Sequence, residues 1–136
     1  MSNREPELKL KEKLGKIDTI LKNPVMVEKI NIYKGEVNAE NMDELKSFGD
    51  ELRNKTKESV GVLISKIEDK VGIVCVVNDE LLKSTKLSAG KIVGSLAKIV
   101  GGGGGGRPHL ATAGGKDISG IQDALKAVEK TVQSFL

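Results

Sequence analysis

The stretch "GGGGGGRPHLATAGG", residues 101–115, holds half of the chain's 16 glycines. Glycine loses more conformational freedom on folding than any other residue, so such a density needs a physical reason. A backbone without side chains lets another segment pack closely, or lets another polymer approach N–H groups that can bind an anion. Arg107 follows the run, and its planar guanidinium suits phosphate. The stretch therefore predicts close packing, close approach of phosphate, or both.

The charge distribution points to the same segment. Residues 1–80 carry 14 basic and 16 acidic side chains, whereas residues 81–116 carry six basic and no acidic ones. A basic segment is typical of a protein that binds phosphate, but a solvated helix face without acids has the same composition. Charge alone favours neither interpretation.

The 136-residue chain is long enough for one domain with its own core. Its single cysteine, Cys75, excludes an internal disulfide and a cysteine-based zinc cluster, and its apolar surroundings, "VGIVCVV", predict a buried, inert thiol. No apolar run approaches the length of a membrane helix, and the charged N-terminal sequence lacks the apolar core of a signal peptide. We therefore expect a cytoplasmic protein without membrane contact.

An apolar seam runs through residues 7–22, which we expect to form a helix that ends before Pro24. The seam consists of Leu10, Leu14, Ile17 and Leu21. Two heptads are too short for a stable helix pair, so the seam packs on the following domain, pairs with a second copy in a weak homodimer, or continues a longer helix. We expect a helical arm over residues 1–24 and a globular domain over residues 25–136.

The globular part shows both apolar periodicities. Runs rich in Val and Ile predict strands, and the two runs that flank "EDK" predict an antiparallel hairpin. The predicted strands are residues 28–37, 59–69, 70–79 and 109–115, and the predicted helices are residues 38–57, 79–85, 88–100 and 119–135. The fold class is α+β: an N-terminal helical arm, then a globular mixed α/β domain with a small sheet covered by helices and a glycine-rich loop. In that loop we expect a positive φ at Gly105.

The sequence contains no catalytic constellation that we can recognise. His109 is the only histidine, and the acidic pairs lie on predicted helix surfaces or element ends. Three glycines of the run satisfy the dinucleotide pattern G-x-G-x-x-G, but that pattern needs a strand before it and a helix after it. Here a predicted helix precedes the glycines and Pro108 follows them. We therefore expect no catalytic and no metal-binding residue.

At the glycine run the sequence resembles a known family. Residues 101–117 fill the pattern GG-x-GGGRP-x-x-A-x-x-GG-x-D of the DHH-associated domain, and the resemblance covers about residues 28–136. Gly103 departs from the family, which often has a charged or polar residue there. The domain ends alanyl-tRNA synthetases and also occurs in DHH phosphoesterases. Because no Asp-His-His motif occurs in the chain, the resemblance favours the C-terminal module of a bacterial-type synthetase.

This resemblance implies a tRNA-binding module that contacts the tRNA elbow and helps to couple aminoacylation of tRNA(Ala) with editing of mischarged tRNA. It implies the rest of the synthetase chain as a partner, with ATP, magnesium and zinc held only there. The piece itself is expected to hold no cofactor and to have no enzymatic activity. The residues expected to contact RNA are Lys91, Lys98, Gly101, Gly102, Gly104, Gly105, Gly106, Arg107 and Lys116.

Two other functions remain open. One is a dimerisation or spacer module that binds no RNA, and the other is the single-stranded nucleic-acid-binding domain of a DHH phosphoesterase. The only aromatic residues, Tyr33, Phe48 and Phe135, make a poor platform for stacking bases. This scarcity favours recognition of the shape of a folded RNA.

Overall fold

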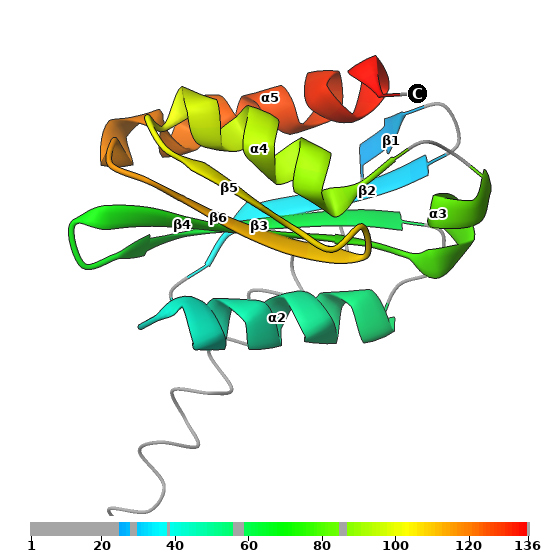
Figure 1. Cartoon of the computed structure of the whole chain (residues 1–136), viewed down its shortest axis with the longest axis horizontal. Helices are drawn as coiled ribbons and strands as arrows, with labels where there is room; N and C mark the ends of the chain where they lie inside the picture. The colour runs from blue at the N-terminus through cyan, green and yellow to red at the C-terminus, as the bar shows by residue number, and fades with distance from the viewer. Residues whose placement is uncertain (1–24, 28–29, 38, 56–58, 85–86, 136) are drawn as a thin grey trace, which may run out of the picture.

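The computed structural model describes residues 25–27, 30–37, 39–55, 59–84 and 87–135 (Figure 1). The helical arm expected over residues 1–24 lies outside the described residues. The same holds for its seam of Leu10, Leu14, Ile17 and Leu21.

A six-stranded mixed sheet forms the centre of the domain. Its strand order is β1-β2-β3-β4-β6-β5, with β2 and β3 parallel and every other neighbouring pair antiparallel. The parallel pair requires a crossover, and the helix α2 supplies it. The strands are β1 (Val25–Val27), β2 (Ile30–Glu36), β3 (Ser59–Ile67), β4 (Lys70–Val77), β5 (Gly103–Gly106) and β6 (Leu110–Gly115).

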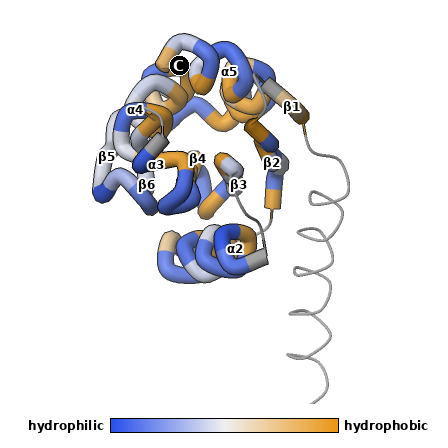
Figure 2. Tube along the Cα trace, turned by 90° about the vertical axis from the view of Figure 1, so that its right-hand side faces the viewer, coloured by the Kyte–Doolittle hydropathy of each residue, from blue (hydrophilic) through white to orange (hydrophobic). Residues whose placement is uncertain are grey.

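Helices cover both faces of this sheet. One face carries α2 (Met42–Lys55), and the other carries α4 (Ala89–Ile99) and α5 (Ile121–Ser134), as Figure 1 shows. Two shorter helices, α3 (Asp79–Ser84) and the 3-10 helix η1 (Ile118–Gly120), lie in connections. Apolar residues gather on the inward sides of the helices and polar residues on the outward sides (Figure 2), as expected for helices that cover a sheet.

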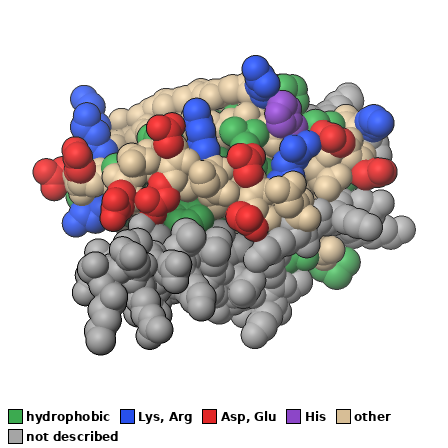
Figure 3. All heavy atoms as spheres, turned by 90° about the horizontal axis from the view of Figure 1, so that it is seen from below, with side chains coloured by type: hydrophobic (Ala, Val, Ile, Leu, Met, Phe, Trp, Pro, Cys, Tyr) green, Lys and Arg blue, Asp and Glu red, His purple; other side chains and the backbone are tan. Residues whose placement is uncertain are grey.

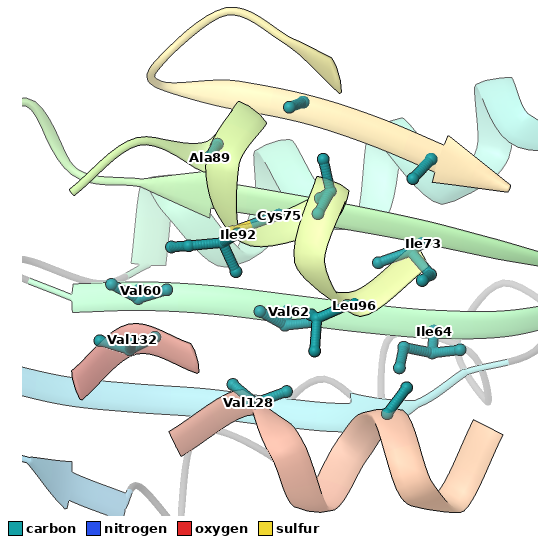
Figure 4. Close-up of a cluster of buried hydrophobic side chains, with 14 of the residues drawn as sticks. Val60, Val62, Ile64, Ile73, Cys75, Ala89, Ile92, Leu96, Val128 and Val132 are labelled. Carbon is teal, nitrogen blue, oxygen red and sulfur yellow. The ribbon is translucent and has the colours of Figure 1, made fainter. Parts of the chain in front are cut away.

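Two apolar clusters fill the spaces between these layers. The larger one lies between the sheet and α4 and α5, and includes Ile73, Ile92 and Leu96 (Figure 4). The smaller one lies between the sheet and α2, and includes Leu45 and Phe48. β4 is buried along its whole length from Val71 because it lies in the middle of the sheet with helices on both faces.

The thiol of Cys75 belongs to the larger cluster (Figure 4). Its complete burial raises the pKa of the thiol, because the apolar surroundings disfavour the thiolate. The prediction of a buried cysteine is therefore confirmed.

The predicted fold class is confirmed, as is the β3–β4 hairpin, whose last pair joins Ile67 to Lys70. The predicted strand over residues 109–115 is also present, as β6. The short strand β1 was not predicted, because three residues before the first predicted strand carry no periodicity of their own.

The glycine run is the main difference from the prediction. Residues Gly103–Gly106 are not a loop but the edge strand β5, paired with β6 from Gly103↔Gly114 to Gly106↔Ala111. Glycine is a poor strand former, so the pairing with β6 and not local preference makes this strand. The expected positive φ at Gly105 is wrong, since Gly101 is the only glycine with a positive φ, 68°, among the described residues.

Candidate functional site

The exposed strand β5 is the centre of the candidate site. All four of its glycines are exposed, and in the sheet it pairs with β6 alone. Figure 2 shows β5 at the outer edge of the sheet, with α4 on one side of that edge and α2 on the other. The strand therefore presents bare backbone along an edge that no described strand covers.

The glycines of β5 alternate in their surroundings. A Cβ at Gly104 would overlap Ala113, and one at Gly106 would lie 2.9 Å from the Cα of Ala111. At Gly103 and Gly105, by contrast, a Cβ would meet nothing within 4 Å. Packing on β6 thus explains Gly104 and Gly106, whereas Gly103 and Gly105 face open space.

The helix α4 packs against β5 through glycines of its own. A Cβ at Gly90 would lie 3.2 Å from the carbonyl oxygen of Gly106, and one at Gly94 would lie 4.0 Å from that of Gly104. These two helical glycines are four residues apart and so share one face of α4. The N–H of Gly102 also donates to the carbonyl of Ala97, at 2.8 Å, which joins the end of the helix to the start of the strand.

A groove of about 350 Å³ lies along this contact between α4 and β5. Lys91 and Lys98, seven residues apart on the exposed side of α4, line the groove. Its other lining residues are Gly90, Gly94, Ser95, Gly102, Gly103, Gly104 and Phe135. We call it the α4 groove. Two cations beside the bare backbone of β5 suit an anionic polymer that approaches that backbone closely.

The turn that carries Arg107 is held by main-chain hydrogen bonds on three sides. The Arg107 N–H donates to the Leu110 carbonyl at 3.1 Å and closes the β5–β6 hairpin. The Pro108 carbonyl accepts from the N–H of Ala89 at 2.8 Å, and the His109 carbonyl accepts from the N–H of Val77 at 3.0 Å. The position of Arg107 is therefore fixed relative to α4 and β4, while its side chain is exposed.

Arg107 does not line the α4 groove. It lines a second cavity of about 430 Å³ on the opposite side of β5, between the β5–β6 hairpin and α2, together with Gly105, Gly106 and His109. The α2 side of this cavity is formed by Lys46, Asp50 and Arg53. We call it the α2 cavity.

Lys116 lies at the far end of the sheet from Arg107. Its N–H donates to the Val100 carbonyl at 2.9 Å, and the residue lines an apolar cavity of about 370 Å³ with Gly101, Gly102 and the β3–β4 turn. The nine residues predicted to contact RNA thus all lie near β5 or its ends. They do not form one site, because they are divided among the α4 groove, the α2 cavity and this apolar cavity.

The cations of the site are free to meet an external anion. Within the part of the chain that the structure describes, Lys91, Lys98, Arg107 and Lys116 have no ion pair. The described ion pairs involve other residues, Lys34 with Glu129 and Arg53 with Asp79. The absence of acids from residues 81–116 explains this for Lys91, Lys98 and Arg107. Lys116 precedes Asp117, but the Asp117 carboxylate accepts hydrogen bonds from Ser119.

Sequence reasoning missed the residues that α2 contributes. Lys46 and Arg53 lie in the acid-rich part of the chain, and nothing in their spacing indicates that α2 passes the Arg107 turn. Only the tertiary fold brings them there. Figure 3 looks onto this face, where basic side chains (blue) and acidic side chains (red) lie interspersed.

Among the described residues, no group of three or more His, Cys, Asp or Glu side chains is placed to hold a metal ion. None of the helices in the described ranges is long and apolar enough to cross a bilayer.

Comparison with known proteins identifies relatives of the whole described domain. A family model described as "DHHA1 domain" matches residues 14–134. An alanine–tRNA ligase from Bacillus subtilis (strain 168) is 40% identical over 137 residues, which cover 99% of this chain. One from Desulfitobacterium hafniense (strain Y51) is 38% identical over 130 residues, or 96% of this chain. The chain spans only 15% of the length of each of these two relatives.

A solved structure has the same fold as this domain. The C-Ala domain from Aquifex aeolicus alanyl-tRNA synthetase superposes with a TM-score of 0.73 at 29% sequence identity. The match covers 81% of this chain and 97% of that one.

Proposed function

The chain belongs to the DHHA1 domain family, and we propose that it is the module with which an alanyl-tRNA synthetase holds the elbow of its tRNA. Similarity to the C-Ala domain and to two alanine–tRNA ligases supports the choice of parent enzyme. The surface around β5 supports RNA as the partner.

The observation that carries the proposal is the open side of β5. A Cβ at Gly105 would meet nothing within 4 Å, and Gly105 has no positive φ, so neither packing nor backbone conformation requires glycine there. A polymer that lies directly on the strand does require it, because a side chain would hold the polymer away from the backbone. Phosphates of that polymer would neutralise Lys91, Lys98 and Arg107, which have no ion pair with a described residue.

The aromatic residues support recognition of RNA shape. Phe48 of α2 is buried against the sheet and Tyr33 is half-buried, so neither offers an exposed face on which a base can stack. Phe135, which is half-buried and lines the α4 groove, is a single aromatic side chain and makes no platform for successive bases. Contacts through cations and bare backbone report where phosphates lie and not which bases they carry. A folded tRNA corner has such a fixed arrangement of phosphates, whereas an unstructured strand has none.

In the parent enzyme this module would keep one tRNA bound while it is aminoacylated and while a mischarged product is edited. The rest of the synthetase chain would then be its covalent partner and would hold ATP, magnesium and zinc. The reaction would take place in the cytoplasm, and the module alone would bind tRNA without acting on it.

The helical arm expected over residues 1–24 has a separate proposed role. We infer that its seam of Leu10, Leu14, Ile17 and Leu21 supports a weak homodimer that dissociates on dilution. Sedimentation of the chain with and without residues 1–22 tests this. Monomers in both samples at high concentration would contradict the dimer.

A competition experiment tests the tRNA proposal. Labelled tRNA(Ala) is bound to the chain and displaced with three unlabelled RNAs: a non-cognate tRNA, a tRNA with its D-loop to T-loop contact disrupted, and a single-stranded RNA of equal length. We expect the non-cognate tRNA to compete within about tenfold of the cognate one. The other two should compete more weakly. Equal competition by the single-stranded RNA, or competition by the non-cognate tRNA that is much more than tenfold weaker, would contradict recognition of the elbow.

A further inference from the structure

The α2 cavity and the α4 groove are neighbours along one strand. Gly102, Gly103 and Gly104 line the α4 groove, and Gly105 and Gly106 line the α2 cavity. Gly104 and Gly105 are consecutive and strand residues rise about 3.3 Å each, so the two hollows meet at adjacent residues of β5. They open on opposite sides of the sheet edge, because α4 and α2 cover opposite faces (Figure 1).

No side chain of β5 stands between one hollow and the other. The edge between them consists of β5 glycines, all exposed, and a Cβ at Gly103 or Gly105 would meet open space. A chain that follows this path would cross the sheet edge over bare backbone.

Each end of the path carries cations without an ion pair among the described residues. At the α4 end these are Lys91 and Lys98, and at the α2 end they are Lys46 and Arg107. The α2 end also contains His109, a hydrogen-bond donor in either tautomer, and Thr112. Asp50 lines the cavity too, and Arg53 there is paired with Asp79 at 3.0 Å, so the free positive charge at this end comes from Lys46 and Arg107.

We propose that the bound RNA strand crosses the sheet edge over β5, with phosphate contacts to Lys91 and Lys98 on one side and to Lys46 and Arg107 on the other. This inference rests on the proposed function and adds to it a route for the RNA and a contact surface on α2. Lys46 thereby becomes an RNA-binding residue, although it lies in the acid-rich half of the sequence and was not predicted as one.

The first test is the salt dependence of tRNA(Ala) binding by the full 136-residue chain. Each phosphate contact that is lost should reduce the magnitude of the slope of log K against log salt by about 0.7 to 0.9. We expect this reduction in Lys46→Ala and not in Lys46→Arg, which keeps the charge. Lys66→Ala is the matched control, because Lys66 is an exposed lysine of β3 that lines neither hollow.

The second test measures proximity directly and does not depend on charge. Because the native thiol of Cys75 is buried, a cysteine introduced at the surface can be labelled alone with a photo-crosslinker. Lys46→Cys labelled in this way should crosslink to bound tRNA(Ala), whereas labelled Lys66→Cys should give several-fold less crosslink.

The outcomes separate this inference from the proposed function. If Lys91→Ala reduces the slope while Lys46→Ala leaves it unchanged and Lys46→Cys gives no more crosslink than Lys66→Cys, then the RNA stays on the α4 side and the crossing is wrong. If the unaltered chain binds no tRNA, the proposed function itself fails and the crossing fails with it.

Discussion

Gly104 on β5 lies so close to Ala113 on β6 that a Cβ at position 104 would overlap the Cβ of Ala113. The next residue along the strand, Gly105, has no such neighbour. Adjacent positions of one glycine run are therefore under different constraints, and substitutions can separate the contribution of packing from that of recognition.

Gly104→Ala is expected to destabilise the domain by about 1 to 3 kcal/mol, the usual cost of forcing extra atoms into a packed position. Gly105→Ala should leave the free energy of unfolding within about 0.5 kcal/mol of the original value, as for other exposed positions. Urea denaturation of the two variants measures both. Equal stability of the two would mean that β5 shifts away from β6 at little cost.

Gly105→Val is expected to fold normally and to bind tRNA(Ala) at least about tenfold more weakly, a loss of about 1.4 kcal/mol. The added side chain meets no described residue but stands where the RNA backbone is proposed to lie. Binding is measured by filter retention after the melting temperature is shown to be unchanged. Unchanged affinity would remove the open side of β5 from the interface.

Replacement of both Lys91 and Lys98 by alanine is expected to reduce the magnitude of the slope of log K against log salt by about 1.4 to 1.8, as for two lost phosphate contacts. Both lysines are exposed and line the α4 groove, so the fold should be unaffected. Lys126→Ala, an exposed lysine of α5 outside the groove, is the control. A slope equal to that of the control would contradict phosphate contact in the groove.

The stability of the domain should fall at alkaline pH because of Cys75. Burial raises the pKa of this thiol above its ordinary value of 9.0, so above pH 9 the unfolded chain loses a proton that the folded chain keeps. The folded state then binds more protons, and the free energy of unfolding decreases as pH rises, by about 1.4 kcal/mol per unit for one group.

Other groups also titrate at high pH, so the comparison with Cys75→Ala isolates the thiol. That variant should be less stable near neutral pH because it leaves a cavity, but its stability should fall less steeply above pH 9. Parallel slopes for the two proteins in urea denaturation at several pH values would contradict the assignment.

The ion pair between Lys34 on β2 and Glu129 on α5 should contribute more than the more exposed pair of Arg53 and Asp79. The Lys34 ammonium lies 2.5 Å from the Glu129 carboxylate and also donates to the Leu125 carbonyl at 3.1 Å. We expect Lys34→Met to lose about 0.5 to 1.5 kcal/mol of stability. Arg53→Met should lose less, because the Asp79 side chain is 68% exposed. Thermal unfolding of both variants tests the order.

The sequence was sufficient for elements whose apolar pattern is strong. Continuous runs of Val and Ile predicted the β3–β4 hairpin, and apolar residues at helical spacing predicted the helix α5. Both elements are present in the structure. The pattern could not predict β5, because a run of glycines has no periodicity and its conformation depends on β6, which is a non-local partner.

The candidate site was predictable only in part for the same reason. Lys91, Lys98 and Arg107 could be found from the acid-free segment that contains them. Their division between two sides of β5 depends on the strand itself, and Lys46 joins Arg107 only because α2 packs beneath the sheet edge. A contact between segments about 60 residues apart cannot be predicted from the charge or spacing of either segment.

The turn at residues 107–109 is held by main-chain hydrogen bonds with Ala89, Val77 and Leu110. Because these bonds do not involve side chains, Arg107 and His109 can be replaced without dismantling the turn that presents them. Evolution, or a protein engineer, can therefore change what this edge recognises while the scaffold remains intact. A library randomised at these two positions should yield mostly folded proteins with altered ligand preference.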